Sequence, residues 1–145
     1  MPQKEEDIEI QILEFLTLHW IFVWHNDIKG FFDINRGIYR KNKNRFIRPG
    51  ISDIGGIIPW GRGLAIEVKK TKEISFFDKP INDLKLQLKN AQKRGLSQRT
   101  LRRYYHAIEQ REYIDKFIRE WGVAFYASSI NDVIEKMKWF DLEFT

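Results

Sequence analysis

The stretch GISDIGGIIPWGRGLAIEVKK, residues 50–70, sets charged side chains inside two apolar runs. Residues 51–58 and 64–69 are rich in aliphatic residues, and PWGR between them has the proline and glycine of a tight turn. We therefore predict two strands joined as a hairpin. Isolated charges in a core are costly, so we expect Asp53, Glu67 and Lys69 to be paired or to serve a function.

The spacing of these three residues predicts that they meet. Residues two apart on a strand point to the same face, so Glu67 and Lys69 project together, and a turn at PWGR lets Asp53 reach them from the neighbouring strand. Two carboxylates suit a hard divalent ion such as Mg²⁺, which can polarise a phosphate, and an adjacent lysine can hold or deprotonate an attacking water. Phosphodiester hydrolysis follows from these residue types. The alternative is a Glu–Lys pair on the surface of an edge strand, which contributes little.

The sequence on either side of this hairpin predicts alternating helices and strands. Apolar residues at helical spacing predict a helix over residues 5–18, and WIFVWH, residues 20–25, is typical of a strand. Residues 31–41 are predicted to be extended or a hairpin broken at Gly37, followed by a loop over residues 41–50.

The second half of the chain is predicted to be mostly helical. A helix over residues 82–95 stops at Gly95, and Ser97 caps a longer helix over residues 98–121. We expect its inward face to consist of Leu101, Tyr104, Ile108, Phe117 and Trp121, with Gly122 as its C-cap. A strand over residues 123–127 and a last helix over residues 130–138, capped by Ser129, complete a mixed α/β domain with a central sheet.

Composition narrows the class of protein. The chain has 145 residues, 43% of them hydrophobic and 31% charged, which fits one domain with a single core. It contains no cysteine, which excludes a disulfide scaffold, a cysteine-based zinc site and a thiol nucleophile. Its first residues are acidic and no apolar run reaches membrane-spanning length, so we expect a soluble cytoplasmic protein with no membrane partner.

The net charge of +5 is unevenly distributed. Residues 34–52 and residues 84–108 contain no acid, and both segments are rich in lysine and arginine. One such block is usually a solvated face, but two blocks flanking the hairpin indicate a track for nucleic-acid phosphate. The predicted DNA-binding residues are Arg36, Arg40, Lys41, Arg45, Arg48, Lys89, Lys93, Arg99, Arg102 and Arg103.

GISDIGG followed by GRGLAIEVKK resembles the core motif of the PD-(D/E)XK nuclease superfamily, and more narrowly the virus-type replication-repair (VRR-NUC) nucleases. The resemblance implies that Asp53, Glu67 and Lys69 are the catalytic set. It also implies that Asp53, Glu67 and the backbone carbonyl of Val68 bind Mg²⁺ or Mn²⁺. Ser52 stands where the superfamily name has proline.

Two further catalytic residues are implied by the same resemblance. The family's glutamate on the first helix matches Glu9, or alternatively Glu5, and its glutamine matches Gln110 in EQREYIDKFIREWGVAFYASSINDVI. About 40 residues separate Lys69 from Gln110, which is longer than the family pattern. We interpret residues 71–108 as a basic helical insertion that serves as a DNA-clamping arm or a dimerisation helix pair, unless the match at Gln110 is shifted.

Several of these residues also have plainer interpretations. Gln110 shares a predicted helical face with apolar residues and could be a satisfied polar residue at the core edge. Glu9 lies on a predicted helix with Glu5, Glu6 and Asp7, and acids near a helix N-terminus commonly complement the helix dipole. The three histidines are scattered and indicate no HNH-type site, and GIIPWGRG lacks the Lys and Ser/Thr of a phosphate loop. Bases can stack on aromatic side chains, but aromatics on an alternating strand more often form a core. The aromatics concerned are Trp20, Trp24, Phe31 and Phe32.

Together these features predict one nuclease domain over residues 1–145, with an α/β, restriction-endonuclease-like mixed central sheet flanked by helices. We expect a metal-dependent, structure-specific DNA endonuclease that grips the phosphate backbone without reading bases. By the family resemblance the substrate is branched or junction DNA and the protein is a homodimer. The alternative is a DNA-binding module of the same fold that is not catalytic or needs a partner subunit.

Overall fold

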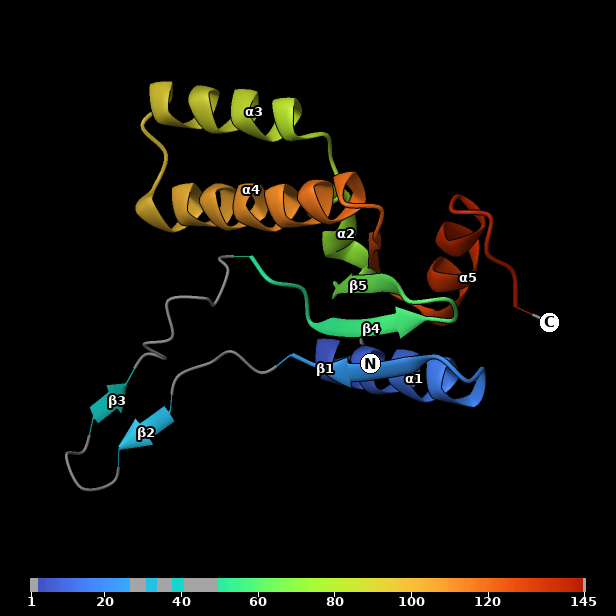
Figure 1. Ribbon diagram of the computed structural model, residues 1–145. Helices are drawn as coiled ribbons and strands as arrows, with labels where there is room; N and C mark the ends of the chain where they lie inside the picture. The colour runs from blue at the N-terminus through green and yellow to red at the C-terminus, as the bar shows by residue number, and fades with distance from the viewer. Residues whose placement is uncertain (1–2, 27–30, 34–37, 41–49, 145) are drawn as a thin grey trace.

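The predicted hairpin lies at the centre of the protein (Figure 1). It consists of β4 (Ile54–Ile58) and β5 (Arg62–Val68), which pair antiparallel with Ile54 opposite Ile66. The turn between them is closed by a 3.0 Å hydrogen bond from the Gly61 N–H to the Ile58 carbonyl, and Gly61 has a φ of 85°. The computed structural model describes residues 3–26, 31–33, 38–40 and 50–144.

The hairpin is extended on both sides into a four-stranded mixed sheet of order β1-β4-β5-β6. β1 (Phe22–His25) pairs antiparallel with β4, and β6 (Val123–Ala127) pairs parallel with β5. The parallel pairing requires a crossover, which α2 (Thr71–Phe77), α3 (Ile81–Lys93) and α4 (Gln98–Arg119) supply. β2 (Phe31–Asp33) and β3 (Ile38–Arg40) pair antiparallel as a separate two-stranded sheet, within the segment predicted to be extended or a hairpin, and Gly37 lies outside the described residues.

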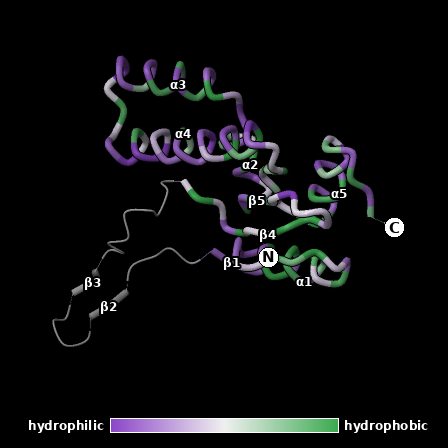
Figure 2. Tube along the Cα trace, viewed as in Figure 1, coloured by the Kyte–Doolittle hydropathy of each residue, from purple (hydrophilic) through white to green (hydrophobic). Residues whose placement is uncertain are grey.

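Helices cover both faces of the sheet. α1 (Glu5–Leu18) and α5 (Ile130–Lys138) pack on one face, where Ile12, Leu16 and Ile66 are fully buried. On the other face α2 and α4 pack against β5 and β6, with Ala65 and Ile114 in the core. Figure 2 shows hydrophobic residues concentrated in β4 and α1, whereas α3 and α4 carry long hydrophilic stretches. The mixed α/β class with flanking helices is thus confirmed.

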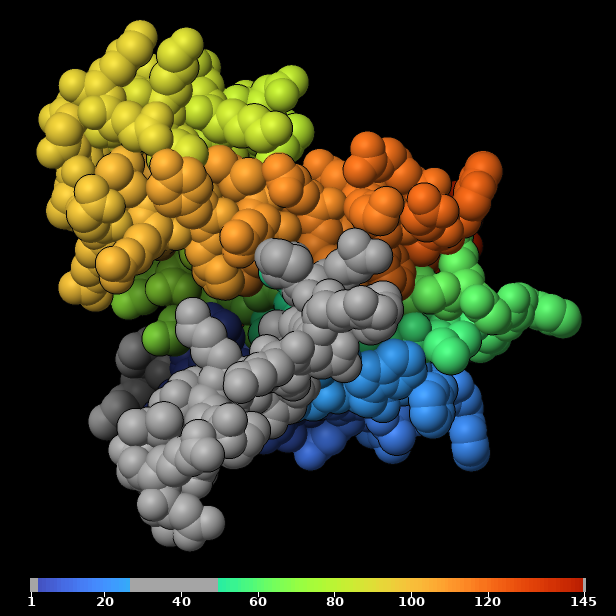
Figure 3. Space-filling view, turned by 60° about the vertical axis from the view of Figure 1, so that its left-hand side comes forward, coloured from blue at the N-terminus to red at the C-terminus, as the bar shows by residue number. Residues whose placement is uncertain are grey.

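α3, the second helix of the crossover, is displaced from the sheet. α3 packs on α4 through buried residues such as Leu84 and Ala91, and Figure 3 shows the two helices side by side along one edge of the molecule. The same view shows the β4–β5 turn projecting from the body of the protein. None of the described helices is both long enough and apolar enough to cross a membrane.

The predicted N-caps are confirmed. The Ser97 hydroxyl accepts a hydrogen bond from the Thr100 N–H at 3.3 Å, and the Ser129 hydroxyl accepts one from the Asp132 N–H at 3.1 Å. Each hydroxyl pairs with one of the backbone N–H groups that a helix leaves unpaired at its N-terminus.

The predicted C-terminal end of α4 is wrong by about two residues. The helix ends at Arg119, and Trp121 adopts a left-handed φ of 67°. Its N–H donates to the Ile118 carbonyl, and the Gly122 N–H donates to the Phe117 carbonyl, which is a Schellman ending with tryptophan at the position that glycine usually takes. Trp121 is therefore 83% exposed rather than directed inward.

Candidate active site

Asp53, Glu67 and Lys69 come together at the end of the hairpin opposite its turn. Ile54 pairs with Ile66, so Asp53 lies opposite Glu67 one step further along, with both side chains on the same face. The Lys69 ammonium lies 3.5 Å from the Glu67 carboxylate, and the two residues are only 6% and 2% exposed. The predicted juxtaposition is present, and the Glu–Lys pair is buried rather than on the surface.

These residues line a cleft of about 580 Å³. Its walls come from α1, the end of β1, the start of β4, the end of β5 and the middle of α4. The cleft contains every catalytic residue predicted from the sequence, together with four polar residues that were not predicted. The lining residues are Glu5, Glu6, Glu9, His25, Asn26, Ile51, Asp53, Glu67, Lys69, His106 and Gln110.

Gln110 is fixed by two neighbours. Its side-chain Nε2 donates to Glu67 Oε1 at 2.8 Å and lies 3.1 Å from His106 Nε2. An amide nitrogen carries two hydrogens, so one serves each partner if His106 is neutral at Nε2. Burial and the nearby Lys69 charge both lower the pKa of His106, which favours that neutral form. Gln110 is thus a direct partner of Glu67 through Nε2, whereas its buried Oε1 accepts no hydrogen bond from the described residues.

The electrostatics of Glu67 favour a bound cation. Burial, followed by the negative charge of Asp53, raises the pKa of Glu67 well above its usual value, and Lys69 opposes the shift without cancelling it. The second carboxylate oxygen of Glu67 is buried and accepts no hydrogen bond from any residue in the described part of the chain. A divalent ion between the two carboxylates would satisfy that oxygen and offset their repulsion.

The backbone of β5 supplies a third oxygen, beside the two carboxylates, on the side of the strand that faces Asp53. The Lys69 N–H donates to Ala127 in β6, whereas the Val68 N–H donates to Asp53 Oδ2 at 2.8 Å. Because the N–H and C=O of one strand residue point the same way, the Val68 carbonyl also faces Asp53. Among the residues that the structure describes, no three His, Cys, Asp or Glu side chains form a metal-holding group. The donor set that fits is two carboxylates and one carbonyl, which suits Mg²⁺ because this ion retains several waters.

The two candidate acids on α1 have different surroundings. Glu9 pairs with the His25 ring, whereas the charges acting on Glu5 are those of Lys69 first and then Asp53. Burial raises the pKa of both carboxyls. Both acids reach the cleft and both feel the charge of Asp53, whereas the charge of Lys69 acts on Glu5.

Lys69 is also held by an aromatic ring. Its ammonium lies 3.9 Å from the centre of the Phe77 ring at the end of α2. This cation–π contact and the Glu67 carboxylate fix the ammonium from two directions. The crossover therefore positions the lysine although it contributes no charged group to the centre.

The basic residues divide into three groups. Arg36, Lys41, Arg45 and Arg48 lie outside the described residues, as does the side chain of Arg40. Lys89 and Lys93 are exposed on α3, away from the cleft. Arg99, Arg102 and Arg103 are exposed on α4 and lie on the same helical stripe as His106 and Gln110, so a basic track on α4 leads to the cleft.

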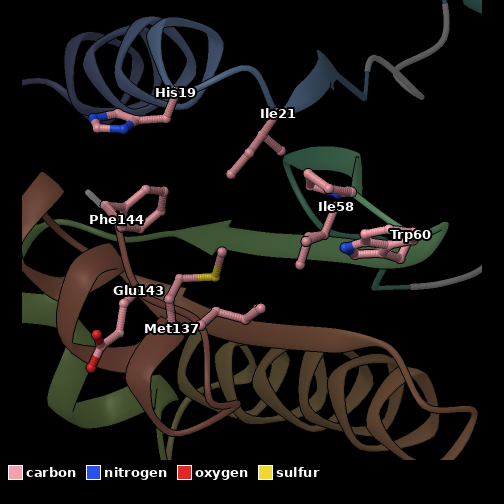
Figure 4. Close-up of a pocket in the computed structure, with 9 residues that line it drawn as sticks. His19, Ile21, Ile58, Trp60, Met137, Glu143 and Phe144 are labelled. Carbon is pink, nitrogen blue, oxygen red and sulfur yellow. The ribbon is translucent and has the colours of Figure 1, made fainter.

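A second cavity of about 250 Å³ lies near the turn end of the sheet (Figure 4). It is lined mainly by apolar residues such as Ile21, Ile58 and Met137, with His19 and Glu143 at its margin. None of the paired carboxylates lines it, and we assign it no chemistry.

In comparisons with family models, curated proteins and solved structures, none matches this chain, so the interpretation of the site rests on its geometry.

Sequence analysis missed four polar residues of the cleft, which are Glu6, His25, Asn26 and His106. His25 and Asn26 reach it because β1 pairs with β4, a long-range pairing that periodicity does not reveal. His106 was detectable, since it lies four residues before Gln110 and therefore one helical turn away on the same face.

Proposed function

We propose that this protein is a metal-dependent nuclease that hydrolyses phosphodiester bonds in DNA, with Asp53 and Glu67 as its metal ligands. The observation that carries this proposal is the buried Oε2 of Glu67, which has no hydrogen-bond partner among the described residues. The negative charge of Asp53 acts on the same carboxylate, and the Lys69 ammonium lies 3.5 Å from it. Buried charges with a purely structural role normally have all their polar atoms paired, and the Glu67 carboxylate does not among the described residues.

The chemistry divides between the ion and the chain. Mg²⁺ or Mn²⁺ held by Asp53, Glu67 and the Val68 carbonyl would polarise a phosphate oxygen and neutralise developing charge. Lys69 is fixed by Glu67 and Phe77, so its ammonium can orient the attacking water and stabilise negative charge on the phosphate. Gln110 holds the Glu67 carboxylate in place and acts as a positioning residue.

The fold and the DNA track support the same proposal. A mixed sheet with a central hairpin and helices on both faces is compatible with a restriction-endonuclease-like fold, in keeping with the sequence resemblance to VRR-NUC nucleases. The exposed arginines on α4 could bind backbone phosphates beside the cleft. A branched or junction substrate and a homodimer come from the resemblance alone.

The test uses labelled four-way junctions, flaps, nicked duplexes and linear duplexes, each with Mg²⁺, Mn²⁺ or EDTA. We expect cleavage that requires a metal and is lost in Lys69→Ala. Lys72→Ala is the matched control, because Lys72 is an exposed lysine on α2 that makes no contact with the carboxylates. Salt-dependent DNA binding without cleavage under every metal condition would instead support a non-catalytic or partner-dependent module.

A further inference from the structure

The half of the sheet that leads to the candidate active site is not covered by α4. That helix packs on β5 and β6, and on the same face β1 and β4 expose Phe22, Trp24 and Ile57. These side chains are 68%, 40% and 45% exposed, respectively. The expectation that Trp24 belongs to a core is therefore wrong: the strand alternates as predicted, but its outer face has no covering helix among the described residues.

We call Phe22, Trp24 and Ile57 the apolar strip. The strand register places it on the face of the sheet that carries Asp53 and Glu67. Phe22 pairs with Ile57 and Trp24 pairs with Gly55, and cross-strand partners share a face. Gly55 is two residues from Asp53, so the two positions are about 7 Å apart along β4 and point the same way. The strip therefore begins beside the carboxylates and extends away from them.

The Trp24 ring is held in a built position. A Cβ on Gly55 would lie 2.6 Å from the indole Nε1 and 2.8 Å from Cε2, so the ring crosses Gly55 where any larger residue would displace it. The indole N–H donates to Asn26 Oδ1 at 2.9 Å, and the Asn26 amide donates to the Ser52 carbonyl at 3.0 Å. The ring's polar atom is thus satisfied, and the part that remains exposed is apolar.

Phe22 extends the same surface. Its ring centre lies 5.5 Å from that of Trp24. The backbone N–H of Asn26 also donates to the Asp53 carbonyl at 2.8 Å, which ties the position of the aromatic strip to that of the catalytic aspartate. The strip is thus continuous with the candidate active site.

We propose that Trp24 and Phe22 form a stacking platform for unpaired bases of the DNA strand whose phosphate occupies the Asp53–Glu67 site. Aromatic side chains stack on any base, whereas bases inside an intact duplex are already stacked and cannot reach the platform. The proposal rests on the nuclease function for the identity of the ligand. It assigns the substrate class as DNA with unpaired nucleotides next to the scissile phosphate.

The test measures binding without cleavage. Short single-stranded oligonucleotides that carry 2-aminopurine, and the same sequence as a duplex, are titrated with protein in EDTA. We expect 2-aminopurine fluorescence to be quenched in the single strand, and Trp24→Leu to abolish the quenching and weaken single-strand binding roughly tenfold. Trp24→Phe keeps a ring and is expected to retain part of both effects. Phe22→Leu is expected to weaken binding in the same direction.

Trp60→Leu is the matched control, because Trp60 is fully exposed at the β4–β5 turn, at the opposite end of β4 from Asp53. Circular dichroism verifies that each variant is folded. Equal quenching and affinity in Trp24→Leu and Trp60→Leu would overturn the platform. So would a loss of dimerisation in Trp24→Leu with unchanged DNA binding, which would assign the strip to a second copy of this chain.

Cleavage of flap and duplex DNA with Mg²⁺ or Mn²⁺ separates the two proposals. If quenching depends on Trp24 but wild-type protein cuts no substrate, the platform stands and the nuclease proposal fails. If the protein cuts DNA and the ratio of flap to duplex cleavage is the same in Trp24→Leu as in the wild type, the nuclease proposal stands and the platform proposal fails.

Discussion

Gly50→Ala should destabilise the protein and separate the candidate aspartate from α4. Gly50 has a φ of 73°, and a Cβ there would lie 2.4 Å from the Glu109 carbonyl oxygen and 2.7 Å from the Gln110 backbone nitrogen. The left-handed backbone costs a residue with a side chain about 1–2 kcal/mol. The clash is with helix backbone, which cannot rotate away, and overpacking of this kind adds about 1–3 kcal/mol.

Two other glycines isolate the clash from the backbone cost. Gly61 and Gly95 have φ values of 85° and 66°, but a Cβ on either would meet no atom within 4 Å. Gly61→Ala and Gly95→Ala therefore carry only the left-handed cost. For a domain near this size about 1 kcal/mol corresponds to about 2–4 °C in melting temperature, so Gly50→Ala should melt roughly 6 °C below both controls.

Thermal melts followed by circular dichroism measure this difference directly. Equal melting temperatures for the three variants would refute the close approach of Gly50 to α4, and with it the packing that brings Asp53 near Gln110. A second readout is DNA cleavage, which should fall in Gly50→Ala and be retained in Gly95→Ala, because Gly95 lies at the far end of the α3–α4 pair.

Two further perturbations test the charges. In EDTA at neutral pH, Glu67→Gln should raise the melting temperature of the protein. Because the pKa of Glu67 is raised in the folded state, this carboxyl contributes to stability at low pH, and that contribution is lost as the pH rises through the folded-state pKa. The advantage of the variant over the wild type should therefore disappear on acidification. Mn²⁺ at a concentration of about 100 times its Kd should stabilise the wild type by about 2.7 kcal/mol, and it should stabilise Glu67→Gln much less. An equal gain in stability for both proteins would argue against the metal site. Arg102→Gln should weaken binding to all DNA sequences alike and reduce the slope of log K against log salt by about 1, measured by salt titration of duplex binding; an unchanged slope would remove Arg102 from the phosphate track.

The features that sequence analysis predicted are those with local causes. The β4–β5 hairpin follows from a proline and glycine between two apolar runs, and the caps at Ser97 and Ser129 follow from a hydroxyl before a helical period. The meeting of Asp53, Glu67 and Lys69 is also local, because a period of two and one tight turn determine it. Each signal lies within about 20 residues of the feature that it predicts.

The features that sequence analysis missed depend on which elements cover each face of the sheet and where each helix ends. Trp24 alternates correctly on β1, but only the tertiary arrangement reveals that α4 leaves that part of the sheet open. Trp121 was expected inside because it continues the apolar face of α4, yet the helix ends before it. A left-handed tryptophan is unfavourable in isolation, so local preference predicts glycine at that position. The glycine stands one residue later, at Gly122, where a Cβ would lie 2.2 Å from Phe117 Cδ1.

The crossover between β5 and β6 has a consequence for the order of folding. The β4–β5 hairpin closes through a turn of a few residues, whereas β6 reaches β5 only after residues 69–122 are arranged. Short-range pairs form first because closing their loops costs less entropy, so we expect Asp53, Glu67 and Lys69 to assemble before Gln110 arrives. Doubling the length of a flexible connection costs only about 0.6 kcal/mol, so a long helical arm can occupy the crossover without disturbing the part of the molecule that forms first.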